Sequence, residues 1–224
     1  MKKYELTSEV KVKFGVTFKR IRALIDFGNV KKGELGGFIE KEENLSHENN
    51  AWVYDDAKVY GNAEVSGNAR VYSDAWVYGN AKVYDDAWVY GNAWVYGNAR
   101  VSDDAEVSGN ARVSGNARVS GNARVSGNAR VYGNARVSGN ARVSGNAEVS
   151  GNADYVLIGR IGSRFGFTTF FRNKNNEIYV SCGCFLGTLA KFRKKVKETH
   201  GTDTKYAKVY QAAADLAEMQ ILNQ

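Results

Sequence analysis

Few side chains in this sequence could support acid–base, nucleophilic or metal chemistry. Its 224 residues include two histidines, His47 and His200, and two cysteines, Cys182 and Cys184. A histidine acts as a general base when a second group orients it, and neither histidine has an evident partner in the sequence. The cysteines are two residues apart and would point to one face of a strand, but a zinc site usually needs four ligands. We therefore expect buried, reduced thiols, no catalytic residue, no bound metal and no cofactor.

Four aspartates would lie close together if the repeat described below stacks its units. Asp85 and Asp86 precede Asp103 and Asp104 by eighteen residues, which would place all four at one corner of the fold. Oxygen-rich corners can hold calcium, so this is a candidate cation site. The simpler interpretation, which we favour, is that aspartate replaces Gly-Asn in tight turns and faces water.

The elements that must position these residues are set by a very regular array. Seventeen six-residue units run without interruption from Ala51 to Asn152, each reading Ala-x-Val-Tyr/Ser-Gly/Asp/Ser-Asn/Asp. The alternation predicts one short strand per unit, with Ala and Val on one side. The fifth and sixth residues tolerate the left-handed backbone of a tight corner. A period this strict predicts a solenoid, whose units bury their apolar sides only by stacking.

The array resembles the hexapeptide repeat of left-handed parallel β-helix proteins. In that family an aliphatic residue is followed four places later by a small one, as Val53 is by Ala57 here. The resemblance implies left-handed winding, three units per eighteen-residue coil, about six coils and a core of Val and Ala alone. Many proteins of this family are acyltransferases with a histidine base, but residues 51–152 contain no histidine.

The flanks are expected to cover the two open ends of the column, which would otherwise template aggregation. We predict a mainly β protein with an N-terminal β cap and irregular first coil at 1–50, the β-helix at 51–158, and a C-terminal α+β domain at 159–224. In this interpretation residues 153–158 complete the sixth coil, with Tyr155 in the valine position.

Each flank has a predicted internal structure. Residues 4–24 alternate as a hairpin turning at Phe14-Gly15, with apolar candidates Val10, Val12, Phe14, Phe18 and Ile21. Residues 155–183 are predicted to be strands with a turn at 174–176. Helices are expected over 189–199, with Thr188 as N-cap, and over 204–222, whose buried side would be Tyr206, Val209, Tyr210, Ala213, Leu216, Ala217 and Ile221.

The flanks also carry a resemblance of their own. Residues 22–27, 36–39 and 43–46 look like the first part of hexapeptide-repeat proteins that have no established enzyme activity. The C-terminal region, through its segments 161–171, 181–185 and 198–201, resembles a small uncharacterised domain common in phage and prophage proteins of gut bacteria. The resemblance implies a phage- or prophage-encoded protein.

Stacking every eighteen residues sorts the outward side chains into columns whose chemistry changes along the axis. All four tryptophans, and all but one of the tyrosines in the array, lie between residues 52 and 96. They would form either ladders that stabilise an exposed sheet or a docking surface for a second copy or another protein. The candidate binding or oligomer face is Trp52, Arg70, Trp76, Tyr78, Trp88, Trp94 and Tyr96, with Trp76 and Trp94 at its centre. Self-association as a dimer or trimer is the first partner we expect.

The second half of the array is basic. Residues 105–147 carry six arginines and one glutamate. Stacked arginines repel one another unless an anion, such as the phosphate of a nucleotide or nucleic acid, lies beside them. The candidate anion face is Arg100, Arg112, Arg118, Arg130 and Arg136. A solvated basic face is the alternative that we favour here, and also for the helical run Lys191, Arg193, Lys194, Lys195 and Lys197.

The sequence favours a binding protein, because the faces of a solenoid are extended binding surfaces and the aromatic content exceeds what a spacer needs. The net charge of +7 lies mostly in residues 153–224, which carry +5. The polar N-terminus does not resemble a signal peptide, and no apolar run could span a membrane, so we expect a cytoplasmic protein, in the host cytoplasm if phage-encoded. The predicted function is non-enzymatic capture of a host protein, a nucleotide or a nucleic acid, an inhibitor of host defence being one such role. The alternatives are an acyltransferase and a structural spacer or oligomerisation module.

Overall fold

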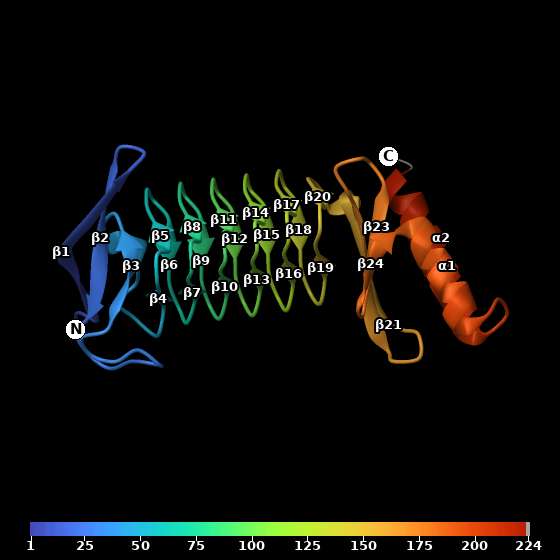
Figure 1. Cartoon of the computed structure of the whole chain (residues 1–224), viewed down its shortest axis with the longest axis horizontal. Coiled ribbons are helices and arrows are strands. Elements are labelled where there is room, and N and C mark those ends of the chain that lie inside the picture. The colour runs from blue at the N-terminus through green and yellow to red at the C-terminus, as the bar shows by residue number, and fades with distance from the viewer. Residues whose placement is uncertain (223–224) are drawn as a thin grey trace.

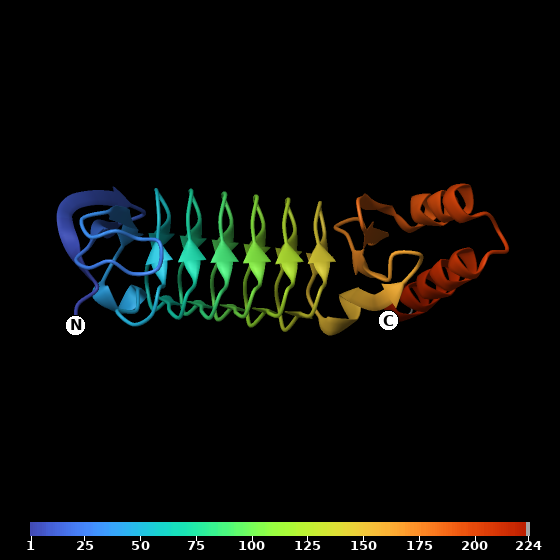
Figure 2. The same cartoon turned by 90° about the horizontal axis from the view of Figure 1, so that it is seen from below.

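The computed structural model shows an elongated molecule in which a β-solenoid joins two end caps (Figure 1). The structure describes residues 1–222. Array strands β4 to β20 each contain the second and third residues of a hexad. Seen from below, the coils follow one another at an even spacing between the caps (Figure 2). The predicted mainly β solenoid of about six coils is confirmed. Its left-handed winding, implied by the family resemblance, stays a prediction.

The array strands form three parallel sheets, one on each side of the solenoid, and we name each face after its first array strand. The β4 face contains β4 (Trp52–Val53), β7 (Arg70–Val71), β10 (Trp88–Val89), β13 (Glu106–Val107), β16 (Arg124–Val125) and β19 (Arg142–Val143). The β5 face contains β5 (Lys58–Val59), β8 (Trp76–Val77), β11 (Trp94–Val95), β14 (Arg112–Val113), β17 (Arg130–Val131) and β20 (Glu148–Val149). The β6 face contains β6 (Glu64–Val65), β9 (Lys82–Val83), β12 (Arg100–Val101), β15 (Arg118–Val119) and β18 (Arg136–Val137).

The pairing register confirms the predicted columns. Trp94 pairs with Trp76 and with Arg112, and Arg118 pairs with Arg100 and with Arg136. Each partner is eighteen residues away, so identical positions of successive coils lie directly side by side. The outward chemistry of each face can therefore be followed from the sequence.

The corners form because the fifth residue of each hexad accepts a left-handed backbone. From Asp55 to Gly145 this residue has a positive φ, for example +56° at Asp85 and +70° at Gly91. Only glycine and short polar residues occupy the position, which is where such a conformation costs least. Each unit is therefore one strand followed by one turn.

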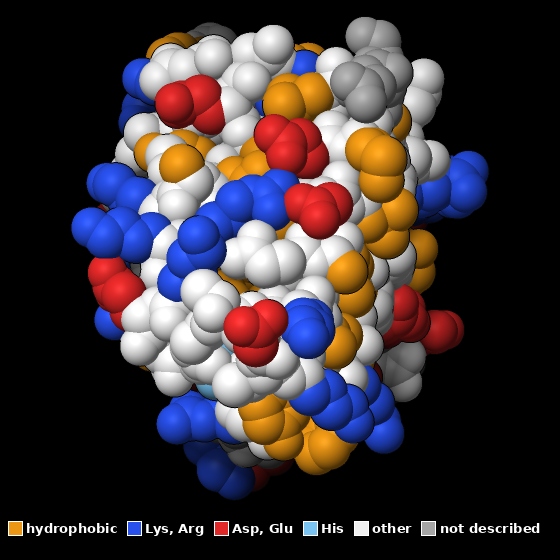
Figure 3. Space-filling view, turned by 90° about the vertical axis from the view of Figure 1, so that its right-hand side faces the viewer, with side chains coloured by type: hydrophobic (Ala, Val, Ile, Leu, Met, Phe, Trp, Pro, Cys, Tyr) orange, Lys and Arg blue, Asp and Glu red, His pale blue; other side chains and the backbone are white. Residues whose placement is uncertain are grey.

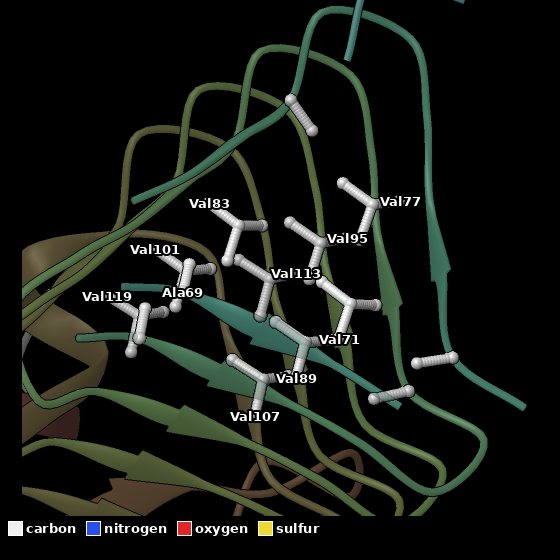
Figure 4. Packing of buried hydrophobic residues seen from close by; sticks show 14 of the residues in the cluster. Ala69, Val71, Val77, Val83, Val89, Val95, Val101, Val107, Val113 and Val119 are labelled. Carbon is white, nitrogen blue, oxygen red and sulfur yellow. The ribbon is translucent and has the colours of Figure 1, made fainter. Parts of the chain in front are cut away.

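The core contains the valines and alanines of the array. All of them, from Ala57 to Val149, are at most 1% exposed. In Figure 4 the labelled valines of the three faces point into one shared interior, with Val83, Val101 and Val119 in a single row. Burial of such a side chain contributes roughly 1.5–3 kcal/mol, so the repeated valine is the main source of hydrophobic stabilisation.

The N-terminal cap extends the β5 face. Strands β1 (Tyr4–Lys13), β2 (Val16–Ala23) and β3 (Leu35–Ile39) form antiparallel pairs, and β3 then pairs in parallel with β5. Ile39 lies opposite Val59, twenty residues away, so the first coil contains two residues more than the eighteen of a regular coil.

One part of the hairpin prediction is wrong. Phe18 and Ile21 are buried, but Val10, Val12 and Phe14 are 52%, 70% and 75% exposed. The register of β1 against β2 shifts between Leu6 and Val10, so an irregularity lies between the buried start of β1 and its exposed end. Alternation read from sequence cannot locate such a shift.

The C-terminal cap is a four-stranded antiparallel sheet covered by two helices. Its elements are β21 (Tyr155–Ile161), β22 (Gly166–Arg172), β23 (Ile178–Cys182), β24 (Phe185–Thr188), α1 (Leu189–His200) and α2 (Lys205–Leu222). Phe171 belongs to the solenoid core cluster, and Lys174 donates its N–H to the carbonyl of Asn146, so this sheet covers the end of the last coil. The predicted turn at 174–176 and both helices are confirmed, and the Thr188 side chain caps α1.

The sixth coil does not close as predicted. Residues 152–154 form a short 3₁₀ turn, and Tyr155–Ile161 pairs antiparallel with β22 instead of lying beside β18. The carboxylate of Asp154 accepts N–H groups from Ser150 and Gly151 and pairs with Arg172 at 3.0 Å. These bonds turn the chain out of the array and into the cap.

The helices leave one unexpected surface. Tyr206 and Leu216, predicted to be buried, are 39% and 49% exposed, because α2 packs through its alanines and Ile221 instead. Figure 3, which shows this end of the molecule, has a band of hydrophobic side chains among charged ones. Among the described residues, neither helix is long and apolar enough to cross a membrane.

Candidate anion-binding face

His47 lies in the N-terminal cap and serves structure. Its Nδ1 accepts the N–H of Lys3 at 3.2 Å, and its ring stacks on Tyr4 with centroids 4.3 Å apart. The neutral ring then carries its proton on Nε2, which is buried. Burial also lowers the pKa of His47. The ring has no free lone pair with which to accept a proton from a substrate.

His200 lies near one of the two thiols in the C-terminal cap. His200 stacks on Tyr210 with centroids 5.7 Å apart, and both line a shallow cavity of about 110 Å³ together with Cys182. Cys182 accepts a hydrogen bond from the Thr168 hydroxyl at 3.2 Å, and no hydrogen bond between described residues joins it to His200. Cys184 is exposed in the turn after β23, so the expectation of two buried thiols on one strand face is wrong.

The aspartate corner is engaged in hydrogen bonds between coils. A carboxylate oxygen of Asp103 accepts the N–H of Gly121 at 2.8 Å, and Asp86 accepts the side-chain amide of Asn68 at 3.1 Å. Asp85 and Asp103 also have the positive φ that glycine has elsewhere in the array. Within residues 1–222, no three acidic, histidine or cysteine side chains form a group that could hold a metal ion. These contacts favour the interpretation of the aspartates as corner residues.

The predicted aromatic face is partly covered by the N-terminal cap. Trp52 is fully buried beneath Tyr4 and Phe27, and Trp76 is only 6% exposed beneath Phe18. Both side chains point out of the coil, as alternation requires, but cap residues pack over them. Trp52 and Trp76 are therefore excluded from an exposed docking surface, which corrects the predicted centre of that face.

The remaining aromatic residues form ladders. The Tyr78 and Tyr96 rings are stacked with centroids 5.0 Å apart, and Trp94 is partly exposed beside them. On the β4 face the Arg70 guanidinium lies 5.3 Å from the centroid of the Trp88 ring, which is a cation–π contact. Trp88 is 39% exposed. Much of the aromatic surface is therefore already in contact with other side chains of the same protein.

The arginine half contains one ladder that the chain does not neutralise. Arg100, Arg118 and Arg136 pair in register on the β6 face, and all three side chains are exposed. None of them forms an ion pair with a described residue. One coil toward the N-terminus on the same face, Lys82 forms an ion pair with Glu64 at 2.8 Å. We name Arg100, Arg118 and Arg136 the arginine ladder.

The other two predicted anion-face residues lie on the β5 face and have partners. Arg130 contacts Glu148 at 3.6 Å, and the Arg112 guanidinium lies 5.1 Å from the Trp94 ring. On the β4 face Arg124 pairs with Glu106 at 3.0 Å, whereas the exposed Arg142 makes no ion pair with a described residue. Arg142 was not among the predicted residues, although its place in the column of Arg124 was visible in the sequence.

The basic helix is also partly neutralised. Arg193 extends from α1 to α2, where it contacts Asp215 at 2.6 Å and Glu218 at 2.8 Å. It therefore joins the two helices and is not part of an exposed basic surface, which corrects the prediction for this residue. Lys194 and Lys197 stay exposed.

The fold and its repeats define a β-solenoid repeat protein. The family model described as the YdcK β-solenoid repeat matches residues 63–79, 105–121, 111–127, 117–133, 123–139, 129–145 and 135–151. A curated relative is the uncharacterised acetyltransferase YdcK of Escherichia coli strain K12, which is 36% identical over 63 residues. That similarity covers 25% of this chain and only 19% of the relative's length.

Proposed function

We propose that this protein is a non-enzymatic binding protein that holds an anionic partner on the β6 face of its solenoid. The observation that carries this proposal is the arginine ladder, three exposed guanidinium groups in register without a carboxylate partner among the described residues. Neighbouring strands are about 4.8 Å apart. At that separation two unit charges repel by roughly 1 kcal/mol even in water, so an anion across the ladder is favoured.

A test uses a fluorescently labelled single-stranded oligonucleotide as a polyanion. The double variant Arg118→Gln/Arg136→Gln should lower its affinity about tenfold at low salt. Each phosphate contact on a single strand contributes about 0.7 to the slope of log affinity against log salt, so the slope should fall by about 1.4. Anisotropy titrations over a series of salt concentrations measure both quantities.

A charge-matched control lies in the C-terminal cap. Lys194→Gln/Lys197→Gln removes the same two charges from the exposed side of α1 and should change the affinity little. Equal losses in both double variants would mean that only net charge matters, and the proposed face would be wrong.

Acyl transfer is the second candidate, because the relative that matches part of the array carries the name of an acetyltransferase. The histidine geometry does not favour it, since the Nδ1 of His47 is occupied and no histidine lies in the array. Transfer of an acetyl group from acetyl-coenzyme A that is lost in His47→Ala would support this candidate over ours.

A phage or prophage source, capture of a host protein, and self-association stay proposals. Trp88 and Trp94 are the tryptophans left accessible for contact with a second copy or another protein. Sedimentation of Trp88→Ala/Trp94→Ala beside the unsubstituted chain tests that surface. An unchanged oligomeric state would exclude these residues from an interface between copies.

A further inference from the structure

The tyrosine ladder of the β5 face is interrupted at one coil. The fourth residues of its hexads are, in order, Tyr60, Tyr78, Tyr96, Ser114, Tyr132 and Ser150. The first three rings are stacked, with both pairs of centroids 5.0 Å apart and the planes of Tyr78 and Tyr96 inclined by only 3°. Ser114 has no ring, and Tyr132 lies one coil beyond it. One ring is therefore missing from an otherwise continuous stack.

The gap has the dimensions of one planar ring. Tyr96 and Tyr132 are two coils apart, about 10 Å at the usual strand spacing. A ring midway between them lies about 5 Å from each, which is within the range of stacked aromatic pairs. A cavity of about 290 Å³ lies at this place, lined by Tyr96, Arg112, Ser114, Arg130, Tyr132 and Glu148.

The charges around the cavity favour a negatively charged ligand. Arg112 and Arg130 are both exposed, and Arg112 makes no ion pair with a described residue. Arg130 contacts Glu148 at 3.6 Å, which is a long ion pair. Two guanidinium groups and one carboxylate leave a net positive charge beside the gap.

We propose that this gap binds a nucleotide, with the base stacked between Tyr96 and Tyr132 and the phosphate held by Arg112. Ser114 also lines the gap, and a serine hydroxyl can donate to or accept from an edge of the base. Base stacking on aromatic side chains is worth about 1–3 kcal/mol per base by alanine substitution, or roughly 5- to 150-fold in affinity, and it tolerates any base. The inference goes beyond the proposed function, since the gap lies on the β5 face and the arginine ladder lies on the β6 face.

The same chemistry fits a free nucleotide or one nucleotide of a single strand. Arg100 and Arg118 follow Tyr96 and Ser114 by four residues, around one corner of the solenoid. A strand whose base enters the gap would therefore carry neighbouring phosphates toward the arginine ladder. Adenosine monophosphate and a short oligodeoxyadenylate are the two probes that separate these sources.

The first experiment compares parts of the ligand by calorimetry at low salt. Adenosine monophosphate should bind, whereas ribose 5-phosphate, which lacks the base, and adenosine, which lacks the phosphate, should each bind at least tenfold more weakly. Equal affinities for adenosine monophosphate and ribose 5-phosphate would show that no base is stacked and would overturn the inference.

The second experiment fills the gap. Ser114→Tyr supplies the missing ring and should lower the affinity for adenosine monophosphate at least tenfold while the chain stays folded. Its matched control is Ser108→Tyr, which makes the same change on the β4 face, after Tyr54, Tyr72 and Tyr90, and should leave the affinity unchanged. Thermal unfolding followed by circular dichroism checks that both variants fold.

The outcomes separate this inference from the proposed function. If the unsubstituted chain does not bind adenosine monophosphate, or Ser114→Tyr binds it equally well, the nucleotide site is wrong, even if Arg118→Gln/Arg136→Gln still weakens oligonucleotide binding. If adenosine monophosphate binds in the gap but the arginine double variant changes nothing, the nucleotide site stands and the ladder does not. If Ser114→Tyr binds neither adenosine monophosphate nor the oligodeoxyadenylate, the result supports a single strand as the ligand. If it loses only the binding of adenosine monophosphate, the result supports a free nucleotide.

Discussion

Lys3 shows how single charged residues of this chain serve its structure. Its side chain is 1% exposed, and its Nζ donates to the carbonyl oxygens of Glu48, Asn49 and Ala51. Burial lowers the pKa of Lys3 to about 8. Lys3 therefore holds the N-terminus against the first coil. The sequence pattern alone would predict a lysine that is exposed to solvent. The ladder arginines differ because nothing in residues 1–222 neutralises them.

The half-buried tyrosines make the fold sensitive to alkaline pH. Burial raises the pKa of Tyr72 and Tyr78 from 10.0 to about 12. Between pH 10 and 12 the unfolded chain has lost these protons while the folded chain keeps them. Unfolding then releases protons, so the free energy of unfolding should fall as pH rises through this window. Urea unfolding at pH 9.5 and 11.5 measures the change.

The matched variant for this prediction is Tyr72→Phe/Tyr78→Phe, which keeps the stacked rings and removes the titrating hydroxyls. Its free energy of unfolding should depend less on pH between 10 and 12. A pH dependence as steep as that of the unsubstituted chain would assign the effect to other groups.

At the scale of single elements, the corners are held together by asparagine ladders. Along one corner the side-chain amide of each asparagine donates to the next, from Asn62 through Asn80, Asn98 and Asn116 to Asn134, at 3.0–3.2 Å. Asn98→Ala removes one donated and one accepted bond and should lower the free energy of unfolding by about 1–3 kcal/mol.

Asn98→Asp separates the two bonds, because a carboxylate still accepts from Asn80 but cannot donate to Asn116. The Asn98→Asp variant should be less stable than the unsubstituted chain at neutral pH. Its free energy of unfolding should rise as pH falls and the carboxyl gains a proton. Denaturant unfolding of both variants tests the ladder, and an effect of Asn98→Ala close to zero would show that water replaces these bonds without cost.

The strands and corners were predictable from sequence because each hexad carries its own local signals. Val and Ala alternate with outward residues, and the fifth residue tolerates a left-handed backbone, so the columns of all three faces followed directly. The sequence did not predict which outward side chains would be covered by other parts of the protein. Trp52 and Trp76 point outward as alternation requires, but their burial depends on the cap hairpin and its register shift. The pairing of Arg130 with Glu148 was visible only once the columns were considered together.

At the scale of the whole molecule, the solenoid behaves as a scaffold of interchangeable coils. Each coil pairs with the coils on either side of it, and the N-terminal cap reaches as far as Trp76 of the second array coil, so between the caps stability should be nearly a sum over coils. The exposed chemistry is different, because the arginine ladder and the gap between Tyr96 and Tyr132 depend on which coil follows which. Fold and binding can therefore be changed independently.

Deletion of residues 105–122 tests this independence. It removes one full coil of eighteen residues and joins hexads in the correct phase, so the chain should fold cooperatively with a modestly lower melting temperature and a length shorter by about 4.8 Å. Tyr132 would then stack directly on Tyr96, and Arg112 and Ser114 would be absent, so binding of adenosine monophosphate should be lost.

Deletion of residues 105–121 is the matched control, since it removes one residue fewer and shifts every later hexad out of phase by one position. The later hexads keep their own alternation, but the extra residue must bulge at the junction corner, as the two-residue insertion does in the first coil, so this variant should melt at a lower temperature than the 105–122 deletion. Circular dichroism and small-angle scattering distinguish the two deletions. If both melt at the same temperature, the column does not depend on the strict six-residue phase.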